Sequence, residues 1–130
     1  MRSFDDTPFN RELGFTLVEY GDGRASVAAG VSPWFLQENG VVHGGVLAAL
    51  ADTAGVYALR GDARFSGALT GVELKINFLE AARPDRGPLV ATARVLRRGR
   101  TLGICEANVK QREILVATAL LTYLFLARRQ

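Results

Sequence analysis

Residues 37–52 decide the fold, and they read Gln37-Glu-Asn-Gly-Val-Val-His-Gly-Gly-Val-Leu-Ala-Ala-Leu-Ala-Asp52. From 44 to 59 the only strongly polar side chains are Asp52 and Thr53, apart from the hydroxyl of Tyr57. A helix that is apolar on nearly every face is normally buried, and a buried carboxylate is costly unless it is paired, hydrated or used. Asp52 is therefore the first residue that needs an explanation.

Composition limits the classes of protein to consider. The chain has 130 residues, 48% of them hydrophobic and 22% charged, which is ordinary for one globular domain. A single cysteine, Cys105, excludes an intramolecular disulfide and a multi-cysteine metal site, and a single histidine, His43, excludes a His-pair zinc motif. No apolar signal core begins the chain, and the longest apolar run, 114–127, is short of the roughly 20 residues that span a membrane. We therefore expect one cytoplasmic domain without a metal, with residues 1–12 as an N-terminal extension.

Positive charge gathers in the second half of the chain. Residues 83–112 carry eight basic side chains against two acidic ones, whereas residues 1–62 carry four arginines against eight acids. Clustered arginine favours a phosphate-bearing partner, although a solvated basic sheet face is the simpler interpretation. Neither an aromatic-rich strand nor a helix-turn-helix pattern accompanies the charge, so the sequence does not indicate a nucleic-acid-binding protein.

The order of the predicted elements is that of an α+β domain. A helix is predicted from about Gly44 to Leu59, ending before Gly61, and one helical turn is expected after Pro33. Six strands are predicted, over 13–20, 24–31, 72–78, 89–97, 101–110 and 114–126. Apolar and polar residues alternate over 72–78, which predicts a half-buried strand there. A single helix this apolar needs a curved antiparallel sheet wrapped around it.

These residues resemble the hotdog-fold acyl-CoA thioesterases, in the PaaI-like branch of the hydroxybenzoyl-CoA thioesterase superfamily. The best marker is His43-Gly44-Gly45 followed by an acid, Asp52, nine residues after the histidine. It is supported by Gln37, six residues before the histidine, and by the stretches 72–79 and 97–101. The resemblance implies a hotdog fold, in which a curved antiparallel sheet wraps a long central helix. It also implies hydrolysis of an acyl- or aryl-CoA thioester, with coenzyme A present only as part of the substrate.

Thioester hydrolysis needs a donor for the developing oxyanion and a carboxylate that activates water or attacks directly. A glycine at a helix start supplies an unpaired N–H, reinforced by the helix dipole, and lets the thioester approach without a Cβ in the way. The resemblance assigns this donor to Gly44 and the carboxylate to Asp52. It also assigns to Gln37 the amide that touches the thioester, a position at which PaaI-type proteins commonly have Asn.

The spacing of these residues predicts an oligomer. Eight residues separate Gly44 from Asp52, or roughly 12 Å along a helix, so one chain cannot easily aim both at one carbonyl carbon. Two paired subunits could, with Gly44 and Gln37 from one chain and Asp52 from the other. The resemblance agrees, since the family builds its sites at a dimer interface. We expect a homodimer, alone or within a tetramer, with two composite sites.

Further candidates each have a structural alternative. His43 is a possible base, but its position also suits a helix cap, and Gly45 is a possible close-packing glycine. Asn39 is a candidate for capping a turn. Thr70 is the nearest hydroxyl that could orient the water or the acid, because the position four residues after Asp52 is a valine.

The remaining candidate residues are three arginines at the predicted hairpin turn and the single cysteine. Arg97, Arg98 and Arg100 are candidate contacts for the phosphates of coenzyme A, or else form a solvated turn. Cys105 shares a strand face with Ala107 and Val109, which predicts a core thiol and not a nucleophile.

Two rival functions remain open at this point. A hotdog-fold hydratase or dehydratase also binds acyl thioesters, but it needs a histidine and an acid arranged to move protons at the α and β carbons. A non-catalytic acyl-CoA-binding module is the other rival. Hydration of an enoyl-CoA without thiol release would identify the first, and tight binding without turnover the second.

Overall fold

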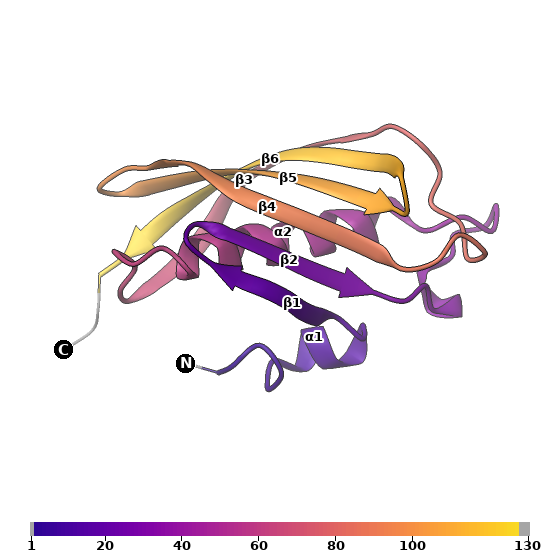
Figure 1. Ribbon diagram of the computed structural model, residues 1–130, viewed down its shortest axis with the longest axis horizontal. Helices are drawn as coiled ribbons and strands as arrows, with labels where there is room; N and C mark the ends of the chain where they lie inside the picture. The colour runs from indigo at the N-terminus through magenta and orange to yellow at the C-terminus, as the bar shows by residue number, and fades with distance from the viewer. Residues whose placement is uncertain (1, 128–130) are drawn as a thin grey trace.

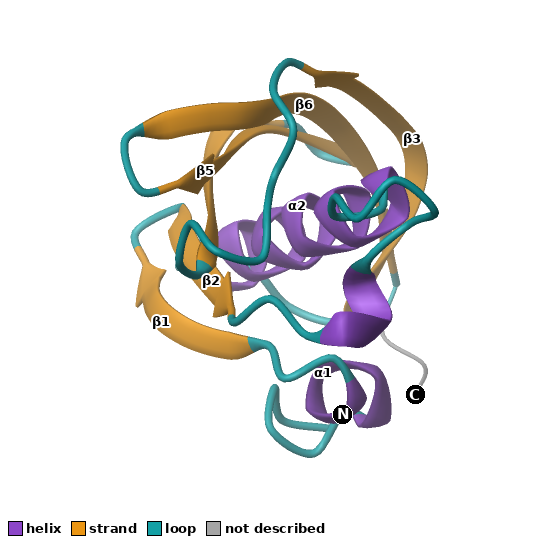
Figure 2. Ribbon diagram, turned by 90° about the vertical axis from the view of Figure 1, so that its right-hand side faces the viewer, coloured by secondary structure: helices purple, strands orange, loops and turns teal. Residues whose placement is uncertain are grey.

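The computed structural model describes residues 2–127 and contains one curved sheet around one long helix (Figure 1). The elements, in chain order, are α1 (Pro8–Glu12), β1 (Thr16–Gly21), β2 (Arg24–Ala29), the 3-10 helix η1 (Pro33–Phe35), α2 (Gly44–Arg60), β3 (Ala68–Phe78), β4 (Leu89–Arg98), β5 (Leu102–Gln111) and β6 (Ile114–Leu126). The strands pair antiparallel in the order β1-β2-β4-β5-β6-β3. Figure 2 shows this sheet curving round α2. The predicted α+β hotdog arrangement is confirmed.

Helix α2 and the 3-10 helix η1 lie close to the predicted positions, whereas α1 was not predicted. Helix α2 begins at Gly44 as predicted and ends at Arg60, with Gly61 as its C-cap. The expected helical turn after Pro33 is η1. Strand β1 begins later than expected because Gly14, at φ +65°, reverses the chain between α1 and the strand. No helix within residues 2–127 is long and apolar enough to cross a membrane.

The core lies between α2 and the middle of the sheet. The helix buries one face against strands that have many alanines among their inward side chains, and these small residues let the helix axis approach the sheet closely. The buried alanines of the sheet are Ala25, Ala29, Ala91, Ala93, Ala107, Ala117 and Ala119. Cys105 lies in the same core, with its Sγ 3.6 Å from the Gly55 carbonyl oxygen. Burial raises the pKa of this thiol to about 12, so the predicted core thiol is confirmed.

The predicted N-terminal extension packs against the body of the domain. The Phe4 ring meets the ring of Tyr57 on α2 edge-on, with centroids 5.0 Å apart. The Asn10 side chain is buried and donates from Nδ2 to the Phe4 carbonyl oxygen at 3.2 Å. Residues 4–12 therefore cover part of α2 that the sheet leaves open.

Strand β3 differs from the prediction, since a half-buried strand was expected and most of β3 is exposed. Val72 and Phe78 are each 54% exposed and Leu74 is 43% exposed. The physical reason is position: β3 pairs only with β6, at the edge of the sheet, while α2 packs mainly over β2, β4 and β5. Its outer row of backbone N–H and C=O groups has no partner strand within residues 2–127.

One buried amide fixes the connection between β3 and β4. Gln111, at the end of β5, is fully buried. Its Oε1 accepts from the Arg83 N–H at 2.9 Å, while its Nε2 donates to the carbonyl oxygens of Arg83 and Gly87 at 2.6 and 2.8 Å. A single side chain thus satisfies three backbone groups of a loop that has no regular structure.

We expect Gln111→Leu to lower the free energy of unfolding by about 2–4 kcal/mol, because three hydrogen bonds are lost at a buried site. Denaturant unfolding followed by circular dichroism measures this change. Asn108→Leu is the matched control, since Asn108 is an exposed amide on the same strand, and it should cost less than about 1 kcal/mol. Equal losses for the two variants would contradict the role given to Gln111.

Candidate functional site

The first turn of α2 leaves one backbone donor free. His43 is the N-cap, and its Nδ1 accepts from the Gly45 N–H at 2.8 Å. The Val46 N–H donates to the His43 carbonyl oxygen at 3.0 Å. Among residues 2–127 the Gly44 N–H has no acceptor. Since α2 has 17 residues, this free donor lies at the positive end of a long helix dipole.

Gly44 lies under an aromatic ring that a side chain at this position would have to displace. A Cβ added to Gly44 would meet Cζ of Phe78 at 2.9 Å and the neighbouring ring carbons at 3.1 and 3.2 Å. Phe78, at the end of β3, and Gly44 line a hollow of about 460 Å³ together with Val42 and Leu47. Most of the lining is apolar, so a polar atom that enters has the Gly44 N–H as a donor.

Asp52 lies in a separate place, two turns further along α2. The Tyr123 hydroxyl on β6 donates to its Oδ1 at 2.8 Å and lies 3.0 Å from its main-chain oxygen. Within residues 2–127 no donor reaches Oδ2, and the side chain is exposed. Asp52 also borders a groove of about 340 Å³, whose other lining residues are Thr7, Phe9, Asn10, Ala49, Thr53, Val56, Tyr57 and Arg60. One carboxylate oxygen is thus fixed and the other is available.

Helix α2 is less buried than its composition predicts. Gly45 and Asp52 are exposed, and Ala49, Thr53 and Val56 on the same side are half-buried. These five residues form an open stripe along α2. Within residues 2–127 the sheet packs mainly against the opposite side of the helix. Thr7, Phe9 and Asn10 line a groove beside the stripe without filling it, so the stripe and the exposed face of β3 stay open.

Tyr123 is the site residue that sequence reasoning missed. It lies in the predicted strand 114–126, within the longest apolar run of the sequence, and it is 1% exposed and points inward from β6. Burial, followed by the negative charge of Asp52 and the hydrogen bond to it, raises the pKa of this phenol well above its usual range. A buried tyrosine hydroxyl needs a partner, and this requirement was the available indication that an acid lies opposite.

Gln37 and Asn39 form a turn before α2. The Asn39 N–H donates to Oε1 of Gln37, so Gln37 caps the turn that Asn39 was expected to cap. The backbone N–H of Gln37 donates to the Val41 carbonyl oxygen at 2.8 Å, which closes the turn. With Oε1 engaged, the Nε2 group of Gln37 is the part of the side chain left to donate.

The structure does not place Thr70 against Asp52. Thr70 is exposed and makes no side-chain hydrogen bond within residues 2–127. Its neighbour Gly71 faces the carboxylate instead, since a Cβ added there would lie 4.0 Å from Asp52 Oδ1. Successive strand residues point to opposite faces, so Thr70 is directed away from Asp52.

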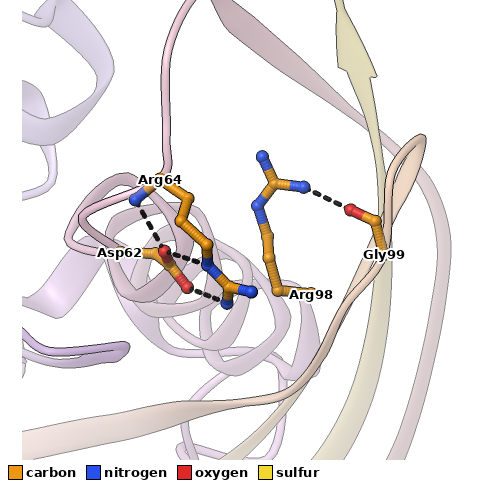
Figure 3. A network of polar contacts seen from close by, with 4 residues as sticks. All are labelled: Asp62, Arg64, Arg98 and Gly99. Carbon is orange, nitrogen blue, oxygen red and sulfur yellow. Dashed lines mark hydrogen bonds and ion pairs between the residues drawn. The ribbon is translucent and has the colours of Figure 1, made fainter.

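Arg98 has structural contacts, whereas Arg97 and Arg100 are exposed. Its guanidinium carbon lies 3.7 Å from the centre of the Phe125 ring, and its Nη1 donates to the Gly99 carbonyl oxygen. Figure 3 shows this side chain beside the ion pair of Asp62 and Arg64. Hydrogen bonds from the side chain and backbone of Arg64 lower the pKa of Asp62 to about 2.

A basic hollow adjoins these side chains. It has a volume of about 720 Å³ and is lined by Asp22, Arg24, Asp62, Arg64, Arg94 and Arg98, with intervening small and apolar residues. Four cations against two acids give it a positive charge, which suits a phosphate-bearing group. Within residues 2–127 no three His, Cys, Asp or Glu side chains come together in a way that could hold a metal ion.

Gly44 and Asp52 are not brought together within one chain. Each borders its own hollow, and neither hollow includes the other residue. Both lie beside β3, however, at different points along the strand: Gly44 next to Phe78 and Asp52 next to Gly71. A donor and a carboxylate thus face the same exposed edge strand from two positions.

The sequence is similar to several known proteins. Residues 39–118 match the protein family described as the thioesterase superfamily. The chain is 33% identical over 96 residues to a Mycobacterium tuberculosis protein named "Putative esterase", and the match covers 72% of this chain and 67% of that protein. It is 40% identical over 72 residues to a Halobacterium salinarum protein of the same name, with 54% of this chain covered. That second match spans 46% of the relative, about half of its length.

A solved structure has the same fold. The E. coli PaaI protein from the phenylacetic acid degradation operon superposes on this chain with a TM-score of 0.87 at 26% sequence identity. The superposition covers 96% of this chain and 88% of that chain.

We expect His43→Ala to lower the free energy of unfolding by about 1 kcal/mol, because it removes the acceptor that caps Gly45. His43→Ser keeps a side-chain oxygen at the N-cap and should retain most of the stability. Thermal unfolding of both variants beside the parent protein measures the difference. If the alanine and serine variants are equally destabilised, His43 does not stabilise the helix as a cap.

Proposed function

The chain belongs to the thioesterase superfamily, and from this premise we propose that it hydrolyses an acyl- or aryl-CoA thioester to the free acid and coenzyme A. The observation that carries the proposal is the free Gly44 N–H at the start of α2. His43 accepts from the next two donors of that turn, the N–H groups of Gly45 and Val46, and leaves the Gly44 N–H unpaired at a point where a side chain would meet the Phe78 ring. Such a donor stabilises the oxyanion that forms when a thioester carbonyl is attacked.

Asp52 supplies the carboxylate, which is the second group that thioester hydrolysis requires. As a general base, its carboxylate takes a proton from water while the water oxygen bonds to the carbonyl carbon. The resulting oxyanion accepts the Gly44 N–H hydrogen bond, and its collapse breaks the C–S bond and releases coenzyme A, whose sulfur takes up the proton. As a nucleophile, the same carboxylate bonds to the carbonyl carbon, and the C–S bond breaks to release coenzyme A as its thiolate. Water then hydrolyses the acyl anhydride, which restores the carboxylate, frees the acid and supplies the proton that the thiolate takes up. Both routes use the same oxygen and give the same products.

The substrate class follows from the surroundings of the site. The mostly apolar hollow beside Gly44 and Phe78 suits an acyl or aryl group. Arg97, Arg98 and Arg100, around the β4–β5 turn, are the proposed contacts for the phosphates of coenzyme A. The E. coli relative comes from an operon for phenylacetic acid degradation, so aryl-CoA thioesters belong among the first substrates to assay.

The proposed enzyme is a homodimer with two composite sites. The exposed edge of β3 and the open stripe of α2 are both surfaces that a second copy would cover. Antiparallel pairing of two β3 strands about Leu74 and Lys75 sets Gly71 opposite the partner's Phe78. Because Asp52 lies at Gly71 and Gly44 lies at Phe78, this pairing supports a site made from Asp52 of one chain and Gly44 of the other. Gln37 would complete the site from the same side as Gly44.

We expect Asp52→Asn to reduce kcat for thiol release by about 10²- to 10⁴-fold, because an amide can neither accept the proton nor attack. A panel of aryl- and alkyl-CoA thioesters, assayed for free thiol, measures this loss. Asp85→Asn is the matched control, since Asp85 is exposed on the loop before β4, and its turnover should equal that of the parent protein.

Undiminished thiol release by Asp52→Asn would overturn the assignment of the carboxylate. Two further results would replace the proposed function as a whole. Hydration of an enoyl-CoA without thiol release would identify a hydratase. Tight binding of the thioester without any turnover would identify a binding module.

Mixed dimers test the composite site. We expect Gln37→Ala and Asp52→Asn chains to be poorly active alone and to recover activity when co-expressed with different affinity tags and purified as heterodimers. One of the two sites then contains an intact Gln37 and an intact Asp52, so turnover per dimer should return to about half of the parent value. Sites contained within single chains would show no recovery.

A further inference from the structure

We propose that Tyr123 is a positioning residue for Asp52: its hydroxyl holds one carboxylate oxygen so that the other faces the reacting thioester. The inference rests on the proposed function and adds to it a residue on a different element, 71 positions away in the sequence. Nothing in the spacing of residues 37–52 indicates it. It follows from the contacts between β6 and α2.

The hydrogen bonds of Tyr123 restrict the side chain of Asp52. The hydroxyl lies 2.8 Å from Oδ1 and 3.0 Å from the main-chain oxygen of the same residue. Both acceptors of one hydroxyl proton therefore belong to Asp52, so the carboxylate is held relative to its own backbone. Without this restraint, an exposed aspartate exchanges among several rotamers. The carboxylate would then have to reach the productive rotamer before each turnover.

Tyr123 is itself held rigidly. It lies on a strand with neighbours on both sides, pairing with Gly71 on β3 and Gly103 on β5. Gly71 packs beside the ring, since a Cβ there would lie in ordinary van der Waals contact with two ring carbons at 3.8 Å. On α2, a Cβ at Gly55 would overlap the hydroxyl oxygen and lie 3.2 Å from Cζ. The absence of a side chain at Gly55 thus creates the space through which Tyr123, a sheet residue, reaches the helix.

The chemistry of Tyr123 is that of a permanent donor. Burial beside a negative charge raises its pKa, so the hydroxyl keeps its proton under the conditions in which Asp52 is ionised. Oδ1 is occupied by this hydrogen bond, and Oδ2 has no donor within residues 2–127. Oδ2 is therefore the oxygen that accepts the proton from water or attacks the carbonyl carbon, while the Tyr123 proton stays in place throughout.

Tyr123→Phe tests the inference, because it removes the hydroxyl and keeps the ring. We expect kcat for thiol release to fall about 10- to 100-fold, the range for losing a hydrogen bond to a charged group, with KM unchanged. Tyr20→Phe is the matched control: Tyr20 is 51% exposed, lies outside the Asp52 groove, and should show the parent turnover. Circular dichroism melts of each variant set an assay temperature at which all are folded.

The Asp52→Asn background separates positioning from a general structural effect. If Tyr123 acts through the carboxylate, Tyr123→Phe causes no further loss once that carboxylate is gone. An equal loss in both backgrounds, or a raised KM with unchanged kcat, would overturn the inference. Gly55→Ala provides a second variant, since it displaces the hydroxyl without removing it, and should also lower kcat.

The two proposals fail in different ways. Full activity of Asp52→Asn would reject the proposed role of the carboxylate, and this inference with it. Loss of activity in Asp52→Asn together with parent kcat in Tyr123→Phe would reject the positioning role alone and leave the proposed function standing.

Discussion

The structure depends on the close approach of one helix to the sheet that curves around it. Alanine side chains on β2, β4, β5 and β6 allow the approach, and α2 fills the concave side with Leu47, Leu50, Ala54 and Leu59. Larger side chains on the sheet would move the helix outward and flatten the curve. The same short distance lets Tyr123 span from sheet to helix, so one packing constraint fixes both the fold and the surroundings of the carboxylate.

Much of the fold could be predicted because the patterns involved are local. The apolar run after Gly44, its stop at Gly61 and the alternation along the strands gave boundaries within a few residues of those observed. The role of His43 as a cap is also local, since it depends on residues two positions apart. Helix α1 was missed because five residues after a proline carry no periodicity to detect.

The parts that could not be predicted depend on pairings between distant segments. Whether an alternating strand is half-buried depends on its place in the sheet. The residue pattern of 72–78 does not indicate that this strand lies at the edge. The Tyr123–Asp52 contact joins residues from β6 and α2, which no spacing rule connects. Thr70 was one residue out of phase with Gly71 for a related reason, since a bulge between Gly71 and Glu73 sets the register.

The position of β3 has a consequence for synthesis on the ribosome. Within residues 2–127 its partner in the sheet is β6, which begins at Ile114, about 35 residues after β3 ends at Phe78. At roughly 5–20 residues per second, translation separates the two strands by a few seconds. During that interval β1, β2 and β4 can pair, while β3 and its apolar side chains have no strand to join. Strand β6 is thus the one that joins β3 to the sheet, and the nascent chain is most exposed to aggregation before β6 has been made.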